Sequence, residues 1–124
     1  MEIKRKQEIV NQYHFDARNA EWEQKNGVPK TKVEVNFHLL KQDYEAHSTH
    51  LVAVVRFMVV FKDFVVSGGI SQENEVIGRV VDQPGDYSQE EIQEISAPVL
   101  DMLRRLTYEV TEIAFDAPGI NLEF

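Results

Sequence analysis

His47 and His50 have the spacing of a possible metal site. On a helix, two histidines three residues apart can bring both imidazoles to one metal ion. Here the pair lies where a polar segment, residues 41–49, enters a strongly apolar stretch, and no acidic third ligand stands at a suitable distance. Solvated loop histidines are the preferred interpretation. We therefore expect no metal and no cofactor.

Two other sets of side chains could perform acid–base or nucleophilic chemistry. Glu73 and Glu75 share one face of a predicted strand, where paired carboxylates can act as acid and base. Ser67 and Ser71 lack the strand–turn–helix context that exposes a nucleophilic serine. Surface charges at strand spacing are common in proteins. We expect no catalytic residue, and the chain is predicted not to be an enzyme.

The glycine pair Gly68-Gly69 is of a kind that can cradle phosphate. No helix start with Lys or Ser/Thr follows it at the spacing of a phosphate loop. Both glycines lie inside a long predicted strand over residues 64–81, where they favour a bulge or a bend. With no chemical motif above background, function has to be sought in the surfaces that the folded elements present.

The most apolar part of the chain, residues 51–70, must be buried in any fold. Its β-branched and aromatic residues predict strands at 50–61 and 64–81, joined by a tight turn at Lys62-Asp63. Both parities of the first strand are largely apolar, which indicates that both of its faces are covered. A helix, a partner subunit or a bound ligand could provide the second cover. Charged residues interrupt the run, so a membrane span is not expected.

Other periodicities complete the predicted elements. Alternating patterns predict strands at residues 8–16 and 33–41. Residues 17–32 carry mixed charge and turn signals and are expected to form a loop. Trp22 is its only large anchor. We expect this side chain either to cap the end of the sheet or to contact a partner.

A long amphipathic helix is predicted over residues 88–113. Ser88 and Glu91 have the spacing of a capping box at its start. Pro98 lies inside it and predicts a kink or a break, with Ser96 as a cap for the second segment. One apolar stripe runs along this helix. Its members are Ile92, Ile95, Val99, Met102, Leu106, Val110 and Ile113.

Together these elements predict a single α+β domain over residues 1–124, with a four-stranded antiparallel sheet and a C-terminal kinked helix. The chain has no cysteine, which excludes disulfides and thiol chemistry. Its 21 acidic and 13 basic residues give a net charge of -8, which disfavours nucleic acid as a partner. The N-terminus leads into no apolar signal segment, so a cytoplasmic location is expected.

Three stretches of this sequence resemble the SecB family of export chaperones. The first is VEVNFHLL, and the second is LVAVVRFMVVF with its central Arg56. The third is SAPVLDMLRRLTYEV, which contains Pro98, followed by AFDAPGINLEF, which contains Asn121 and Phe124. The resemblance implies a four-stranded antiparallel sheet backed by helix, and assembly into homodimers or homotetramers. It also implies binding of unfolded polypeptide in apolar grooves. The sequence departs from SecB at its end, because SecB continues into a second long helix.

The predicted function is a non-catalytic, oligomeric, SecB-like protein that binds unfolded polypeptide. The alternative is an oligomeric adaptor module of the same fold without chaperone activity. No membrane insertion is expected. The predicted binding or subunit interface consists of apolar side chains on the second face of the central strand and in the tail. These are Val52, Val54, Met58 and Val60, followed by Phe115, Leu122 and Phe124.

Overall fold

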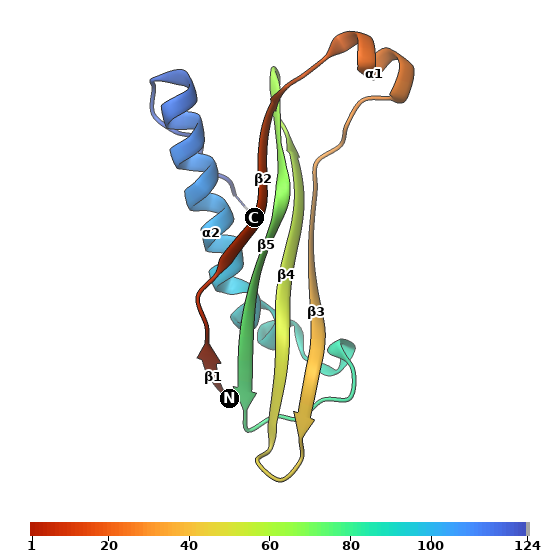
Figure 1. Cartoon of the computed structure of the whole chain (residues 1–124), viewed down its shortest axis with the longest axis vertical. Helices are drawn as coiled ribbons and strands as arrows, with labels where there is room; N and C mark the ends of the chain where they lie inside the picture. The colour runs from red at the N-terminus through yellow and green to blue at the C-terminus, as the bar shows by residue number, and fades with distance from the viewer. Residues whose placement is uncertain (124) are drawn as a thin grey trace.

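The structure, a computed structural model, describes residues 1–123. Five antiparallel strands form one sheet, and a long helix packs on one of its faces (Figure 1). The strands are β1 (Glu2–Arg5), β2 (Ile9–Ala17), β3 (Lys32–Asp43), β4 (Ser48–Val60) and β5 (Phe64–Ile77). The helices are α1 (Ala20–Asn26), the short 3-10 helix η1 (Pro84–Asp86) and α2 (Gln89–Phe115). The predicted α+β class is confirmed, with one strand more than expected.

The sheet places β4 at its centre. β5 lies on one side of β4 and β3 lies on the other. β1 and β2 both pair with β5, one after the other along its length, so together they make a broken edge strand. β3 forms the opposite edge. The four predicted strands correspond to β2, β3, β4 and β5, whereas β1 was not expected.

The hairpin predicted at Lys62-Asp63 is confirmed. β4 and β5 pair continuously on either side of it, and the N–H of Phe61 donates to the carbonyl of Phe64 at 2.9 Å. The predicted irregularity at the glycine pair is present, but the register shift lies in β2, between Val10 and Gln12. A Cβ on Gly68 would stand 2.0 Å from the carbonyl oxygen of Gln12, and its φ is +156°. Only glycine lets β2 approach β5 this closely.

One parity of β4 forms the core with α2. Every second residue of β4 points to the same face of the sheet. The residues on this face are all buried: Leu51, Ala53, Val55, Phe57 and Val59. Ile95, Val99 and Leu103 of α2 are also buried, and they pack against this face. The helix therefore covers one face of the sheet, and β4 meets it with every second residue.

The break predicted near Ser96 is wrong, because α2 is assigned as one helix from Gln89 to Phe115. The hydroxyl of Ser96 donates to the carbonyl of Ile92 at 2.7 Å, within the helix, so Ser96 is not a cap. Pro98 still removes one helical donor, which leaves the carbonyl of Glu94 without its usual partner. Arg5 of β1 donates to that carbonyl at 2.7 Å. The guanidinium of Arg5, remote in sequence, thus replaces the backbone donor that Pro98 lacks.

The buried stripe of α2 also differs from the predicted one beyond Val99. Leu103, Thr107 and Thr111 are buried, whereas Ile113 is 81 % exposed. Met102, Leu106 and Val110 are only partly buried. The threonines enter the interior because their hydroxyls find partners: Tyr13 donates to Thr107 at 3.2 Å, and Thr111 donates to the carbonyl of Thr107 at 2.7 Å.

Three boundaries differ from the sequence-based ones. The predicted loop over residues 17–32 contains α1, which begins after the capping side chain of Asn19 and ends at Gly27. Trp22 is 56 % exposed on α1, so it does not cap the sheet. β5 ends at Ile77 rather than at residue 81, because Gly78 has a φ of +86°. The polar loop before β4 is reduced to a turn at residues 44–47.

Candidate polypeptide-binding surface

The histidine pair is separated by the fold. His47 lies in the turn between β3 and β4 with a φ of +49°, and His50 lies in β4. His50 Nε2 stands 3.3 Å from a carboxylate oxygen of Glu75, its neighbour on β5. Across residues 1–123, no group of three or more His, Cys, Asp or Glu side chains is placed to hold a metal ion. His47 is therefore a turn residue, and His50 belongs to the β4–β5 strand pair.

Glu73 and Glu75 each have a basic partner. Lys6 Nζ lies 3.1 Å from Glu73, and Glu75 faces His50. All four side chains are at least partly exposed to solvent. Their arrangement is that of charge pairs on the rim of a sheet. The two carboxylates are not joined in a shared acid–base site.

The sheet face opposite α2, called the open face from here on, carries the second parity of β4. None of the helices packs on it within the described chain, and Figure 1 shows α2 on the other side of the sheet. Val52, Val54 and Val60 are partly exposed and Met58 is 39 % exposed. These four side chains lie along a single strand and are called the apolar stripe.

Polar side chains flank the apolar stripe on both neighbouring strands. Direct cross-strand neighbours share a face in an antiparallel sheet. On β3 the neighbours of the open-face residues of β4 are Lys32, Glu34, Asn36 and His38. On β5 they are Val65, Ser67, Gly69, Ser71 and Glu73. Val65 extends the apolar surface beside Val60. Elsewhere the stripe is one strand wide, and Arg56 interrupts it between Val54 and Met58.

A hollow deepens the open face next to the apolar stripe. It has a volume of about 500 Å³ and lies over the glycine pair, where β5 has no side chains. Ser71 donates to Asn11 at 2.8 Å on its border, so strand β2 and strand β5 share its wall. The residues that line it are Asn11, Gln12, Val52, Val54, Arg56, Phe57, Gly68, Gly69 and Ser71.

Two tail residues of the predicted interface, Phe115 and Leu122, lie on the other side of the sheet. Phe115 is 51 % exposed, and its ring contacts Phe64 with centroids 5.2 Å apart. Leu122 is partly buried against the core under α2. Phe124 lies outside the described residues. The fold therefore brings together the four predicted residues of β4 and keeps Phe115 and Leu122 apart from them.

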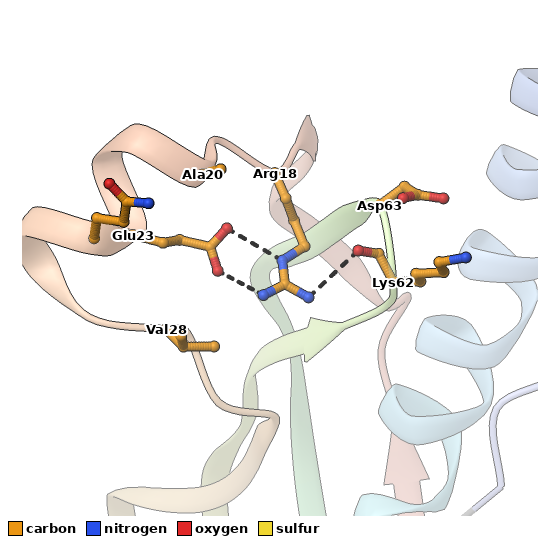
Figure 2. A pocket seen from close by; sticks show the side chains of 7 residues that line it. Arg18, Ala20, Glu23, Val28, Lys62 and Asp63 are labelled. Atoms are coloured by element: carbon orange, nitrogen blue, oxygen red, sulfur yellow. Dashed lines mark hydrogen bonds and ion pairs between the residues drawn. The ribbon is translucent and has the colours of Figure 1, made fainter.

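A second hollow, of about 530 Å³, was not anticipated from the sequence. Figure 2 shows Arg18 reaching from the end of β2 to Glu23 of α1 and to the hairpin main chain at Lys62. The two guanidinium bonds to Glu23 are 2.5 and 3.3 Å, and hydrogen bonding by Arg18 lowers the pKa of this carboxyl. The arrangement ties α1 to the β4–β5 hairpin. The spacing of Arg18 and Glu23 was the only sequence signal for it.

The fold and the open face define a small α+β protein that presents an apolar stripe on an antiparallel sheet. The chain belongs to a family described as "Protein of unknown function (DUF1149)", whose model matches residues 1–124. A crystal structure of a protein of unknown function from Streptococcus agalactiae is similar at 53 % identity. It has a TM-score of 0.95, with 100 % of this chain and 98 % of that chain covered.

A SecB-like chaperone of Mycobacterium tuberculosis, in complex with a ChAD peptide from an antitoxin, is a more distant structural match. The identity is 10 % and the TM-score 0.47, over 98 % of this chain and 88 % of that chain. No curated protein sequence matches the chain. Among the described residues, no helix is both long enough and apolar enough to cross a membrane.

Proposed function

We propose that this protein is a non-catalytic binding protein that holds exposed apolar segments of unfolded polypeptide on its open face. The observation that carries the proposal is the apolar stripe of β4, which α2 leaves uncovered. Apolar residues on an uncovered sheet face are typical of interaction sites. The sequence resemblance to the SecB family supports the same function.

The shape of the apolar stripe suits an extended chain. Its members form two pairs, Val52 with Val54 and Met58 with Val60, and within each pair the spacing of two residues matches that of alternate side chains in an extended peptide. The hollow over Gly69 can take a larger side chain beside Val54. Because the protein has a net charge of -8, peptides with basic flanks are favoured over acidic ones. We expect clients in which apolar residues alternate with polar ones.

The second candidate is an oligomeric adaptor module in which another subunit covers the apolar stripe. It is favoured by the small exposure of the valines in the stripe, which a modest subunit contact could bury completely. Light scattering together with a dye for exposed apolar surface separates the two candidates. A protein that binds the dye retains an accessible stripe, whereas an oligomer without dye binding supports the adaptor.

The test is suppression of aggregation of reduced insulin, since the chain has no cysteine that the reductant could affect. The wild-type protein is expected to suppress light scattering at near-stoichiometric amounts. Met58→Glu places a charge in the stripe and should abolish suppression. Ile113→Glu is the matched control, because Ile113 is apolar and exposed but lies on α2. Failure of the folded wild-type protein to suppress aggregation would overturn the proposal.

A further inference from the structure

β3 is an unprotected edge of the sheet. It is paired with β4 on one side, and no strand of the described chain pairs with the other. It is long, contains no proline, and is regular from Lys32 to Leu39, with a register shift only between Leu39 and Lys41. The free N–H and C=O groups of such an edge are a template for another strand. Most natural edges are shorter or carry a protecting feature along their length.

The helix side of β3 is also incompletely covered. Val33, Val35 and Leu39 face the side on which α2 packs, yet they are only partly buried. In contrast, the residues of β4 that face the same side, such as Leu51 and Val55, are fully buried. Phe37 on the same face is buried, so the core reaches this edge but leaves Val33, Val35 and Leu39 partly exposed. A neighbouring strand would complete their burial.

We infer that a second copy of this chain pairs with β3 in antiparallel register, with the two-fold axis at Asn36. In this register Glu34 faces His38 of the second copy on the open face, and Asn36 faces its own equivalent. On the helix side, Val35 faces Phe37 and Val33 faces Leu39. From Val33 to Leu39 each polar residue opposes a hydrogen-bonding partner and each apolar residue opposes an apolar one; only the end pair, Lys32 with Leu40, is mismatched.

Neighbouring registers are less complementary. With the axis at Phe37, Val33 would face Lys41 and Glu34 would face Leu40. With the axis at Val35, Lys32 would face His38, which pairs two basic side chains. The registers at Asn36 and at Val35 both keep the main pairing within the part of β3 that precedes its register shift, whereas the register at Phe37 extends past it. Side-chain complementarity then favours Asn36 over Val35.

Exposed apolar side chains stand at both ends of this edge. Trp22 and Val28 are exposed before β3 begins, and Leu40 and Tyr44 are exposed where it ends. Figure 1 shows α1 at the far end of β3, opposite the turn that joins β3 to β4. Antiparallel pairing brings the Trp22 end of one copy to the Tyr44 end of the other, twice in the dimer. The same pairing therefore places the exposed apolar side chains at one end of each copy near those at the opposite end of the other.

The dimer so formed has one continuous sheet. A two-fold axis normal to the sheet keeps both α2 helices on one side and both open faces on the other. Its formation does not depend on whether the open face binds polypeptide. The two apolar stripes would lie on the same surface, separated by the paired β3 strands.

Cysteine crosslinking tests the register, because the natural chain has no cysteine. Directly opposed residues have Cα atoms about 4.5–5.5 Å apart, within disulfide range. Asn36→Cys alone should form a disulfide-linked dimer on mild oxidation. Glu34→Cys and His38→Cys should crosslink strongly when the two variants are mixed, and only weakly when each is alone. Glu109→Cys, exposed on α2, is the negative control.

The solution mass of the full chain completes the test. We expect a dimer by light scattering at the crosslinking concentration, and the exposed positions chosen should leave the circular dichroism spectrum unchanged. A monomer would overturn the inference. A dimer in which Asn36→Cys crosslinks no better than Glu109→Cys would overturn it equally, since the subunits would then meet elsewhere.

Discussion

The guanidinium of Arg5 donates to the carbonyl of Glu94 at 2.7 Å, and this carbonyl is the one that Pro98 leaves without a helical donor. A second bond, to the carbonyl of Ile95, is 3.1 Å long. The N-terminal strand β1 is therefore hydrogen-bonded to α2 at the turn that lacks a helical hydrogen bond. This contact explains how a proline is accommodated inside a long helix that must remain continuous to cover the sheet.

Arg5→Ala is expected to lower the free energy of unfolding by about 1 kcal/mol, because two helical carbonyls lose a donor. Pro98→Ala should raise it by about 2–3 kcal/mol, since alanine restores the N–H and removes the ring clash. In the Pro98→Ala background, the cost of Arg5→Ala should shrink by about 0.5 kcal/mol or more. Urea denaturation of the four proteins measures this coupling.

Lys4→Ala is the control for this cycle, because Lys4 is an exposed cation on the same strand, and no contact to α2 is described for it. It should change stability little in either background. Additive effects of Arg5→Ala and Pro98→Ala would show that the guanidinium does not substitute for the missing helical donor.

The capping box of α2 predicts a pH-dependent stability. The Ser88 N–H donates to Glu91 at 2.9 Å, and this bond, with help from Arg79, lowers the pKa of Glu91. A carboxyl with a lowered folded-state pKa stabilises the fold above its ordinary value, and the stabilisation is lost as pH falls through the folded-state pKa. At pH 7, Glu91→Gln should cost about 0.5–1 kcal/mol.

Thermal unfolding of wild type and Glu91→Gln across the acid range measures this effect. The stability difference between the two proteins should be constant near neutral pH and should begin to vanish below about pH 4.5, the ordinary value for glutamate. Ser88→Ala keeps the backbone N–H that bonds Glu91, so it should retain most of the same pH dependence. A difference that persists undiminished in acid would assign the loss to packing instead.

Thr111 anchors the C-terminal segment to α2. Its hydroxyl accepts from the N–H of Ile120 at 2.9 Å and donates to the carbonyl of Thr107. Thr111→Val leaves that N–H without its acceptor, so we expect a loss of about 1–2 kcal/mol and faster amide exchange at Ile120. Thr111→Ser keeps the hydroxyl and should retain protection. Equal exchange in both variants would mean that Ile120 and Leu122 are held by apolar packing alone.

The central strands and the open face were predictable because their information is local. Alternation of apolar residues predicts β4. Apolar residues on both of its parities indicate two covered faces, and because only one long helix is available, the second cover was expected from elsewhere. The hairpin was also predictable from local sequence, because the polar pair Lys62-Asp63 interrupts two apolar strands. The α+β class and the position of the apolar stripe follow from these features.

The elements that sequence reasoning missed depend on distant partners. β1 contains one apolar residue in four, and its anchor is the contact of Arg5 with α2. Thr107 and Thr111 were not expected inside, because their burial depends on hydroxyl bonds that an apolar pattern does not contain. α1 is short and buries none of its residues, so no amphipathic period reveals it.

The most direct test of the central claim is methyl NMR of the protein on addition of a soluble peptide in which valines alternate with polar residues between flanking lysines. We predict that the methyl signals of Val52, Val54, Met58 and Val60 shift together with peptide concentration, while that of the exposed Ile113 does not. Shifts confined to Ile113 and the tail, or no shifts in a folded protein, would contradict binding on the open face.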